Sequence, residues 1–161
     1  MATQAGMSTE RQLVVLRLAQ DVYGFDIHAV REIIRMQEIT RVPHAPEQIE
    51  GVINLRGRIC PVMDLRKRFG LAVTDATADS RIVVVEMAGE DVGVIVDGVT
   101  EVLRVPGDRI QPPSAVVTNA DTRVVEGIVN LDDQLIILID LQMLLTSADH
   151  AIIEDLQLAA A

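Results

Sequence analysis

At 161 residues, the chain is long enough for one domain or for two small lobes that share a core. Apolar residues make up 49% of it and include 22 valines and 16 isoleucines, a composition that favours β-strands. A net charge of −10, with one tyrosine, two phenylalanines and no tryptophan, argues against binding of nucleic acid or of an anionic membrane surface.

The N-terminal segment has no features of a secretory signal. Residues 1–9 are small and polar, and we expect them to form a flexible tail. The longest apolar run, Leu135–Ile139, is far shorter than the roughly 20 residues that span a bilayer. The single cysteine, Cys60, excludes an internal disulfide. The sequence therefore predicts a cytoplasmic protein without membrane insertion.

The first half of the chain predicts a series of short strands. Val30–Met36 forms either a strand or a short helical turn, and a loop marked by Pro43 and Pro46 follows it. A short helix is expected after Asp64, which is placed as its N-cap. The stretches with the apolar, β-branched pattern of strands are Gln12–Leu18, Val22–Ile27, Gly51–Leu55 and Arg58–Met63.

The second half repeats the first. "RQLVVLRLAQDVYGFDIHAVREIIRM" from Arg11 aligns without gaps with "SRIVVVEMAGEDVGVIVDGVTEVLRV" from Ser80. "IEGVINLRGRICPVMDLR" from Ile49 aligns with "VEGIVNLDDQLIILIDLQ" from Val125, and the offset grows from 69 to 76 residues because the connecting loops differ in length. Two matches in the same order indicate an internal duplication. The strands expected here are Arg81–Met87, Val92–Val96, Gly127–Leu131 and Gln134–Ile139.

The repeats predict the architecture. About five short strands in each half indicate a mainly β fold of two small five-stranded barrels, which share a hydrophobic core and leave a groove at their junction. The barrel halves are expected to interleave over roughly 11–75 and 80–147, within a domain of residues 10–147. A short helix should follow Asp140, and residues 148–161 should form a C-terminal amphipathic helix.

The residues that carry enzyme chemistry are not grouped in the sequence. Cys60 lies in the middle of a strand, where a small buried apolar residue is the plainer interpretation. Asp132-Asp133 resembles an acidic phosphoacceptor pair, but the only lysine, Lys67, is in the other half, and a solvated turn explains the pair better. No metal-ligand spacing relates Cys60 to the three histidines, His28, His44 and His150. We therefore expect no catalysis and no metal site.

The stretch "EGVINLRGRICPVMDLRKRFG" (Glu50–Gly70) resembles the signature of the CheW family, the coupling proteins of bacterial chemotaxis. The resemblance continues in "YGFDIHAVREII" before it, and in "VGVIVDGVTEVL", "RIQPP" and "GIVNLDDQLIILIDL" after it. It covers roughly Arg11–Leu145, and it implies two packed SH3-like β-barrels with no enzymatic activity and no cofactor.

The resemblance also implies partners. Proteins of this family join the cytoplasmic tips of methyl-accepting chemoreceptors to a histidine kinase, whose regulatory domain has the same fold and alternates with them in rings. The chain would then be recruited to membrane-associated receptor arrays. The receptor tip would dock in the groove between the barrels, and the kinase would contact their outer ends. By position, the implied receptor-binding residues are Val30, Glu32, Gly51, Arg56 and Val102.

Most of these five positions have a plainer explanation. Val30 and Val102 fit ordinary core positions equally well. Glu32 fits a solvated strand residue and is matched by Glu101 in the second repeat. Gly51 is matched by Gly127, which favours a role in backbone geometry.

Arg56 differs from the other four. In the second repeat Asp132 replaces it and Asp133 replaces Gly57, so the hairpin repeats while the charge at its tip reverses. A solvated turn does not need arginine, and the planar guanidinium can make two hydrogen bonds to a carboxylate or to backbone carbonyls. This favours a functional contact at Arg56.

Two other functions remain open from the sequence. One is a coupling domain of a related chemosensory pathway outside chemotaxis. The other is a small-ligand-binding β protein, which would need a roomy, polar-lined pocket, whereas the uniformly apolar strands predict filled interiors.

Overall fold

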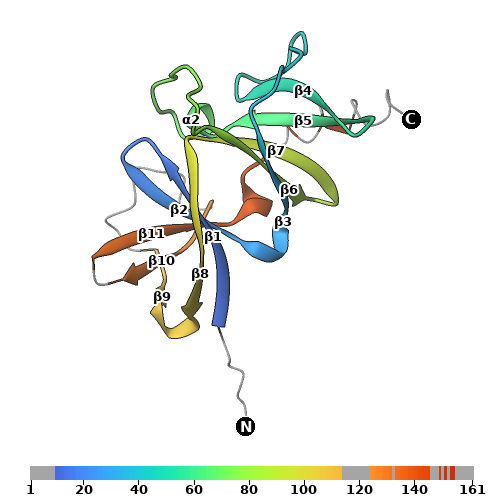
Figure 1. Cartoon of the computed structure of the whole chain (residues 1–161). Coiled ribbons are helices and arrows are strands. Elements are labelled where there is room, and N and C mark those ends of the chain that lie inside the picture. The colour runs from blue at the N-terminus through green and yellow to red at the C-terminus, as the bar shows by residue number, and fades with distance from the viewer. Residues whose placement is uncertain are drawn as a thin grey trace.

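The computed structural model describes residues 10–113, 124–131, 133–145, 149, 151, 153 and 154. These residues are mostly in β-strands, which confirms the predicted fold class (Figure 1). The described strands are β1 (Glu10–Leu18), β2 (Asp21–Asp26), β3 (Val30–Arg35), β4 (Ile49–Leu55), β5 (Arg58–Asp64), β6 (Arg81–Met87), β7 (Glu90–Val96), β8 (Gly98–Pro106), β9 (Ile110–Gln111), β10 (Val125–Leu131) and β11 (Gln134–Ile139). The helical elements are α2 (Leu65–Arg68) and the 3₁₀ turns η1 (Ile27–Ala29), η2 (Gly107–Arg109) and η5 (Leu141–Met143).

The strands form two sheets, each of which curls into a small lobe. The six-strand lobe has the order β8-β1-β2-β11-β10-β9, and the five-strand lobe has the order β3-β6-β7-β5-β4. The difference in strand number comes from β9, which pairs with Ile128 and Val129 of β10. In the five-strand lobe Thr40 makes the equivalent contact as an isolated bridge to Val52 of β4.

The two repeats exchange strands. The first repeat contributes β1 and β2 to the six-strand lobe, where they pair with β8 and β11 of the second repeat. The second repeat contributes β6 and β7 to the five-strand lobe, where they pair with β3 and β5 of the first. The ranges 11–75 and 80–147 therefore describe the repeats and not the lobes, because each repeat crosses from one sheet to the other after its second strand.

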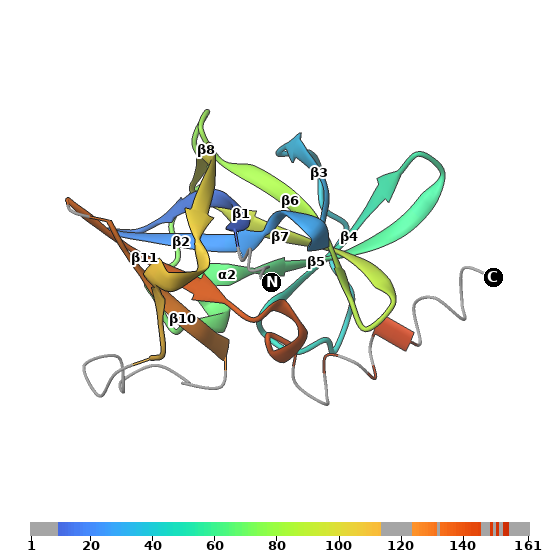
Figure 2. The ribbon, with the colours of Figure 1, turned by 90° about the horizontal axis from the view of Figure 1, so that it is seen from below.

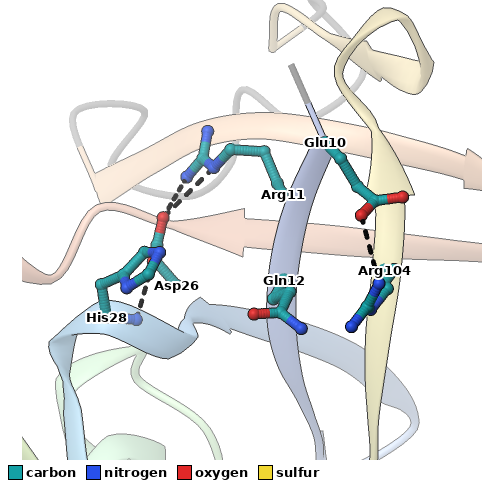
Figure 3. A pocket seen from close by; sticks show the side chains of 6 residues that line it. All are labelled: Glu10, Arg11, Gln12, Asp26, His28 and Arg104. Carbon is teal, nitrogen blue, oxygen red and sulfur yellow. Dashed lines mark hydrogen bonds and ion pairs between the residues drawn. The ribbon is translucent and has the colours of Figure 1, made fainter. Parts of the chain in front are cut away.

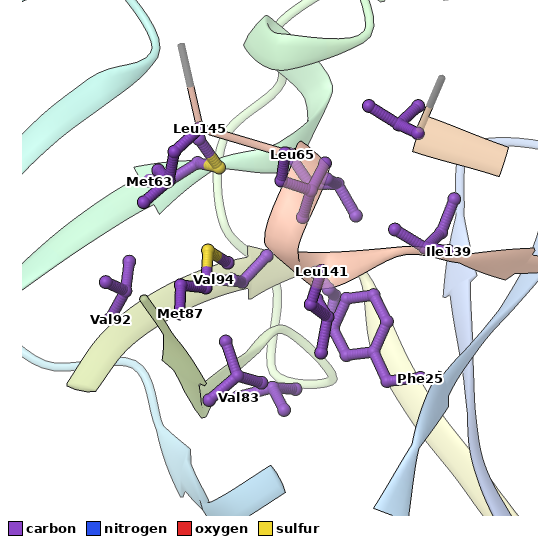
Figure 4. Close-up of a cluster of buried hydrophobic side chains, with 14 of the residues drawn as sticks. Phe25, Met63, Leu65, Val83, Met87, Val92, Val94, Ile139, Leu141 and Leu145 are labelled. Atoms are coloured by element: carbon purple, nitrogen blue, oxygen red, sulfur yellow. The ribbon is translucent and has the colours of Figure 1, made fainter. Parts of the chain in front are cut away.

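The exchange buries apolar side chains of both repeats in one shared core between the lobes. Phe25 of β2, Val94 of β7, Ile139 of β11 and Leu141 of η5 all belong to it (Figure 4). Each lobe also has an interior cluster of its own, and the members of the two clusters are equivalent in the repeats: Leu13, Val15, Val129, Ile136 and Leu138 in one lobe, and Ile82, Val84, Ile53, Cys60 and Val62 in the other. The predicted sharing of a core is confirmed.

Both predicted helix starts after aspartate are present. A side-chain oxygen of Asp64 accepts a hydrogen bond from the Arg66 N–H at 2.9 Å at the start of α2. Asp140 accepts one from the Gln142 N–H at 3.1 Å at the start of η5. Each N-cap thus turns the chain sharply out of the last strand of its repeat.

The ends of the chain fall mainly outside the described residues. This applies to the expected tail of residues 1–9 and to most of the expected helix over 148–161, of which Asp149, Ala151, Ile153 and Glu154 are described and helical. In the described part of the chain, no helix combines the length and the apolar character needed to cross a membrane.

Candidate functional site

The turn that carries Arg56 joins β4 to β5. Arg56 and Gly57 both have positive φ, +54° and +84°, as a two-residue type I′ hairpin turn requires. The side-chain oxygen of Asn54 accepts a hydrogen bond from the Gly57 N–H at 2.7 Å and stabilises this turn. Ala88 and Gly89 have similar φ values, +52° and +83°, in the turn of the β6–β7 hairpin, so the backbone conformation belongs to the turn type. What distinguishes Arg56 is therefore its side chain.

The Arg56 guanidinium forms a two-point ion pair with Glu32 of β3. Its Nη1 donates to Oε1 of Glu32 at 3.0 Å, and its Nη2 donates to Oε2. The hydrogen bonds from Arg56 hold the pKa of Glu32 below its ordinary value, and the pKa of Arg56 is raised for the same reason. The Arg56 side chain nevertheless remains 71% exposed, against 26% for Glu32. The guanidinium is thus oriented by the carboxylate and still open to a partner.

A β-bulge in β3 places Glu32. The pairing of β3 with β6 shifts between Val30, opposite Val85, and Glu32, opposite Val84, which leaves Arg31 as the extra residue. The second repeat has the equivalent bulge at Thr100, whose hydroxyl donates to the Val15 carbonyl at 3.2 Å. A bulge redirects neighbouring side chains. In β3 the residue directly after the bulge is Glu32, whose carboxylate binds Arg56.

The ion pair lies at the edge of a charged hollow of about 500 Å³. Arg31 crosses part of it to reach Glu86 at 3.5 Å and Asp91 at 3.4 Å. The residues that line the hollow are Arg31, Glu32, Arg56, Arg58, Gly89, Glu90 and Asp91. Sequence analysis missed Arg31, Arg58 and the acidic residues of the β6–β7 hairpin, because only the structure brings that hairpin beside the β4–β5 hairpin.

Val30 and Val102 occupy different surroundings. Val30, at the start of β3, is half-buried and packs against the shared core, as does its repeat partner Val99. Val102 is 51% exposed on β8 of the six-strand lobe, and its repeat partner Ile33 is 40% exposed. The interpretation of Val102 as a core residue is therefore wrong. Of the five expected site residues, the structure brings Glu32 and Arg56 into contact, with Val30 on the same strand as Glu32.

Gly51 is buried in β4, where its backbone has φ +152°. A Cβ atom there would lie 2.0 Å from the carbonyl oxygen of Thr40, which bonds to the Val52 N–H at 2.8 Å. In the second repeat a Cβ on Gly127 would approach Gln111 to 2.9 Å. Gly51 thus allows two backbone segments to approach closely below the Arg56 hairpin.

A second hollow, of about 220 Å³, contains His28 (Figure 3). Arg11 donates to Asp26 at 2.8 Å and to Glu126 at 3.0 Å, and Asp26 accepts from the backbone N–H of His28 at 2.9 Å. The arginine is thus held by carboxylates of its own lobe. Within the described residues, no group of three or more histidine, cysteine, aspartate or glutamate side chains could hold a metal ion.

Cys60 is buried in the interior of the five-strand lobe, at the position that Ile136 occupies in the other lobe. Burial raises the pKa of its thiol to about 11, so it is protonated at neutral pH. The interpretation of Cys60 as a small core residue is confirmed.

Comparisons with known proteins agree with this architecture. A family model described as the CheW-like domain matches residues 12–149. A chemotaxis protein CheW from Klebsiella aerogenes is 31% identical over 151 residues, which are 94% of this chain and 91% of that protein. A probable chemotaxis protein CheW from Rhizobium etli is 34% identical over 140 residues, covering 87% of this chain and 90% of the relative.

The solved structures include a close match to the whole fold. The scaffolding protein TtCheW from Thermoanaerobacter tengcongensis superposes with a TM-score of 0.79 at 47% identity, covering 84% of this chain and 88% of that chain. The family model covers residues 12–149, and the duplicated strand pattern and the relatives agree with it. The chain therefore belongs to the family of CheW-like domain proteins.

Proposed function

We propose that this protein is a non-enzymatic adaptor that couples chemoreceptors to the chemotaxis histidine kinase. The relatives are named as chemotaxis proteins, and the structural neighbour is named as a scaffolding protein. The observation that carries the proposal is the arginine at the β4–β5 tip, which is oriented by Glu32 and remains largely exposed. A non-enzymatic scaffold needs such a contact surface and no reactive group.

The receptor surface in this proposal uses both lobes. Val30, Glu32 and Arg56 of the five-strand lobe and Val102 of the six-strand lobe contact the receptor's helical tip, and Gly51 acts only by placing the β4–β5 hairpin. The β4–β5 and β10–β11 hairpins extend to opposite ends of the molecule in both views (Figure 1; Figure 2). Surfaces at the outer ends of the two lobes, separate from the Arg56 tip, contact the regulatory domain of the kinase, and the protein works in the cytoplasm beside the receptor arrays.

A ligand-binding function has less support. The interior of each lobe holds an apolar cluster of buried side chains. The hollow that contains Arg56 is lined mainly by charged residues on the surface. Such a surface suits a protein partner better than an enclosed small molecule.

The proposal predicts the outcome of a co-sedimentation experiment with receptor-containing membranes. The protein should sediment with these membranes, and the kinase should sediment with them in larger amount when the protein is present. Membranes without receptor provide the control. Failure of the protein to sediment above this control would contradict the proposed receptor contact, and equal kinase sedimentation with and without it would contradict coupling.

A further inference from the structure

The short helical element after the last strand of each repeat lies against a hairpin turn of the other lobe. After β5 of the five-strand lobe, α2 approaches the β1–β2 turn of the six-strand lobe, and Asp97 lies between them. After β11 of the six-strand lobe, η5 approaches the β6–β7 turn of the five-strand lobe. The two contacts are equivalent in the repeats, but their side chains differ.

At the η5 contact a single neutral side chain satisfies two backbone groups. The amide oxygen of Gln142 accepts from the Ala88 N–H at 2.9 Å. Its amide nitrogen donates to the Glu86 carbonyl at 3.2 Å. Gln142 therefore holds the β6–β7 turn without help from a charged partner.

At the α2 contact Asp97 bonds to the repeat-equivalent backbone groups, which here belong to Ala19 and Arg17 at the β1–β2 turn. Its carboxylate accepts from the Ala19 N–H at 2.8 Å, and its own N–H donates to the Arg17 carbonyl at 3.0 Å. Arg66 of α2, the repeat partner of Gln142, then holds the carboxylate with bonds of 2.9 Å from Nε and 2.6 Å from Nη2. A third bond, from Nη1 to the Ala72 carbonyl at 2.7 Å, fixes the guanidinium itself.

The position of Asp97 in the chain gives this contact its importance. Asp97 lies between β7 of the five-strand lobe and β8 of the six-strand lobe, where the second repeat crosses from one sheet to the other. From the segment where the chain passes between the sheets, the Asp97 carboxylate thus contacts both the β1–β2 turn and α2. The Arg66 and Asp97 side chains are only 15% and 22% exposed, and the bonds from Arg66 hold the pKa of Asp97 below its ordinary value. The pair therefore stays charged at neutral pH.

The shared core constrains the angle between the lobes only through the fit of its packed side chains, because the free energy of burying apolar surface depends on area and not on direction. Hydrogen bonds are directional and weaken steeply when their angles change. A two-point arginine–carboxylate pair adds the strongest directional constraint of this kind.

We propose that Arg66 and Asp97 are positioning residues that set the angle between the two lobes and thereby place Val102 relative to Glu32 and Arg56. This inference rests on the proposed function for its consequence, because only a partner that contacts both lobes would detect the angle. The angle itself is a property of the free protein and can be measured without any partner.

The first experiment measures the distance between the lobes by double electron–electron resonance. Spin labels are attached at Arg35→Cys of β3 and Arg104→Cys of β8, two exposed and repeat-equivalent positions. Cys60 is buried, and its thiol pKa of about 11 leaves it protonated and poorly reactive at neutral pH.

We expect a narrow distance distribution in the otherwise unchanged protein and a broader or shifted one after Arg66→Ala. Asp97→Asn, which keeps an oxygen for the Ala19 N–H but loses the charge, should act in the same direction. Arg11→Ala removes an ion-paired arginine whose partners, Asp26 and Glu126, lie in its own lobe, and it should leave the distribution unchanged. If folded Arg66→Ala and Asp97→Asn proteins both keep the unchanged distribution, the proposal is overturned, whatever the protein binds.

The second experiment is a double-mutant cycle on receptor binding. Val102→Ala should weaken binding by about threefold or more in the unchanged background and by much less in the Arg66→Ala background, because sites coupled through a shared backbone shift are non-additive while independent sites add. Arg56→Ala should weaken binding in both backgrounds. A Val102→Ala effect of the same size in both backgrounds would mean that the Arg66–Asp97 pair only stabilises the fold, and it would overturn the positioning role.

Discussion

Replacing Arg56 with alanine is expected to weaken receptor binding by about thirty-fold to a thousand-fold while leaving the melting temperature nearly unchanged. The guanidinium is the cationic tip of the β4–β5 turn and is oriented by Glu32, yet most of its surface is free for a partner. Buried arginines at interfaces are frequent binding hot spots, whereas exposed ion pairs contribute little to the stability of a free protein. Receptor affinity and thermal melting should therefore respond very differently.

Exchanging the charges of Glu32 and Arg56 separates two roles of Arg56: a structural ion pair with Glu32 and a cationic contact with the receptor. In the double variant Glu32→Arg/Arg56→Glu the ion pair can re-form, but the turn tip becomes negative. If the cation at the tip contacts the receptor, this variant should bind as poorly as Arg56→Ala. Arg41→Ala, which removes an exposed arginine from another loop of the same lobe, is the control and should bind normally. Full binding by the exchanged variant would contradict a receptor contact at Arg56.

Replacing Gly51 with alanine is expected to lower the free energy of unfolding by about 4 kcal/mol or more, a large part of the stability of a small domain. The new Cβ would lie 2.0 Å from the Thr40 carbonyl oxygen and 3.0 Å from the Cα of Arg41. Both are backbone atoms, so relief requires the pairing between Thr40 and Val52 to break. The φ of +152° adds strain for any residue with a side chain.

Gly57→Ala is the matched control, measured by the same denaturant unfolding. Gly57 also has a positive φ, +84°, but a Cβ added there would meet no atom within 4 Å beyond its chain neighbours, so only the conformational penalty of about 1 kcal/mol remains. A Gly51→Ala protein as stable as Gly57→Ala would contradict the close backbone approach.

The strands and the duplication could be predicted because both depend on local pattern. Apolar positions recur in the same order in both repeats, and each N-cap aspartate lies at or directly after the end of a strand, within one residue of the expected position. The exchange of strands could not be predicted in the same way. The repeats have nearly the same apolar faces, so the pattern of β1 alone does not distinguish β3 from β8 as its neighbour.

The candidate site was predictable only in part. The reversed charge between Arg56 and Asp132 identified one end of the ion pair, while the contact with Glu32 depends on a bulge that the sequence pattern does not reveal. Asp132 lies outside the described residues. The Arg66–Asp97 pair was missed, although the same signal was present: Arg66 is matched by Gln142 and Asp97 by His28. Polar differences between otherwise equivalent repeat positions are thus informative about sites of this fold.

The most direct test of the adaptor function is autophosphorylation of the histidine kinase in a reconstituted mixture. Kinase activity is measured with receptor membranes alone, with this protein alone and with both together. The proposed coupling predicts a large activation only when receptor, kinase and protein are all present, and Arg56→Ala should abolish most of it. Kinase activity that receptor membranes raise equally well without the protein would contradict the account.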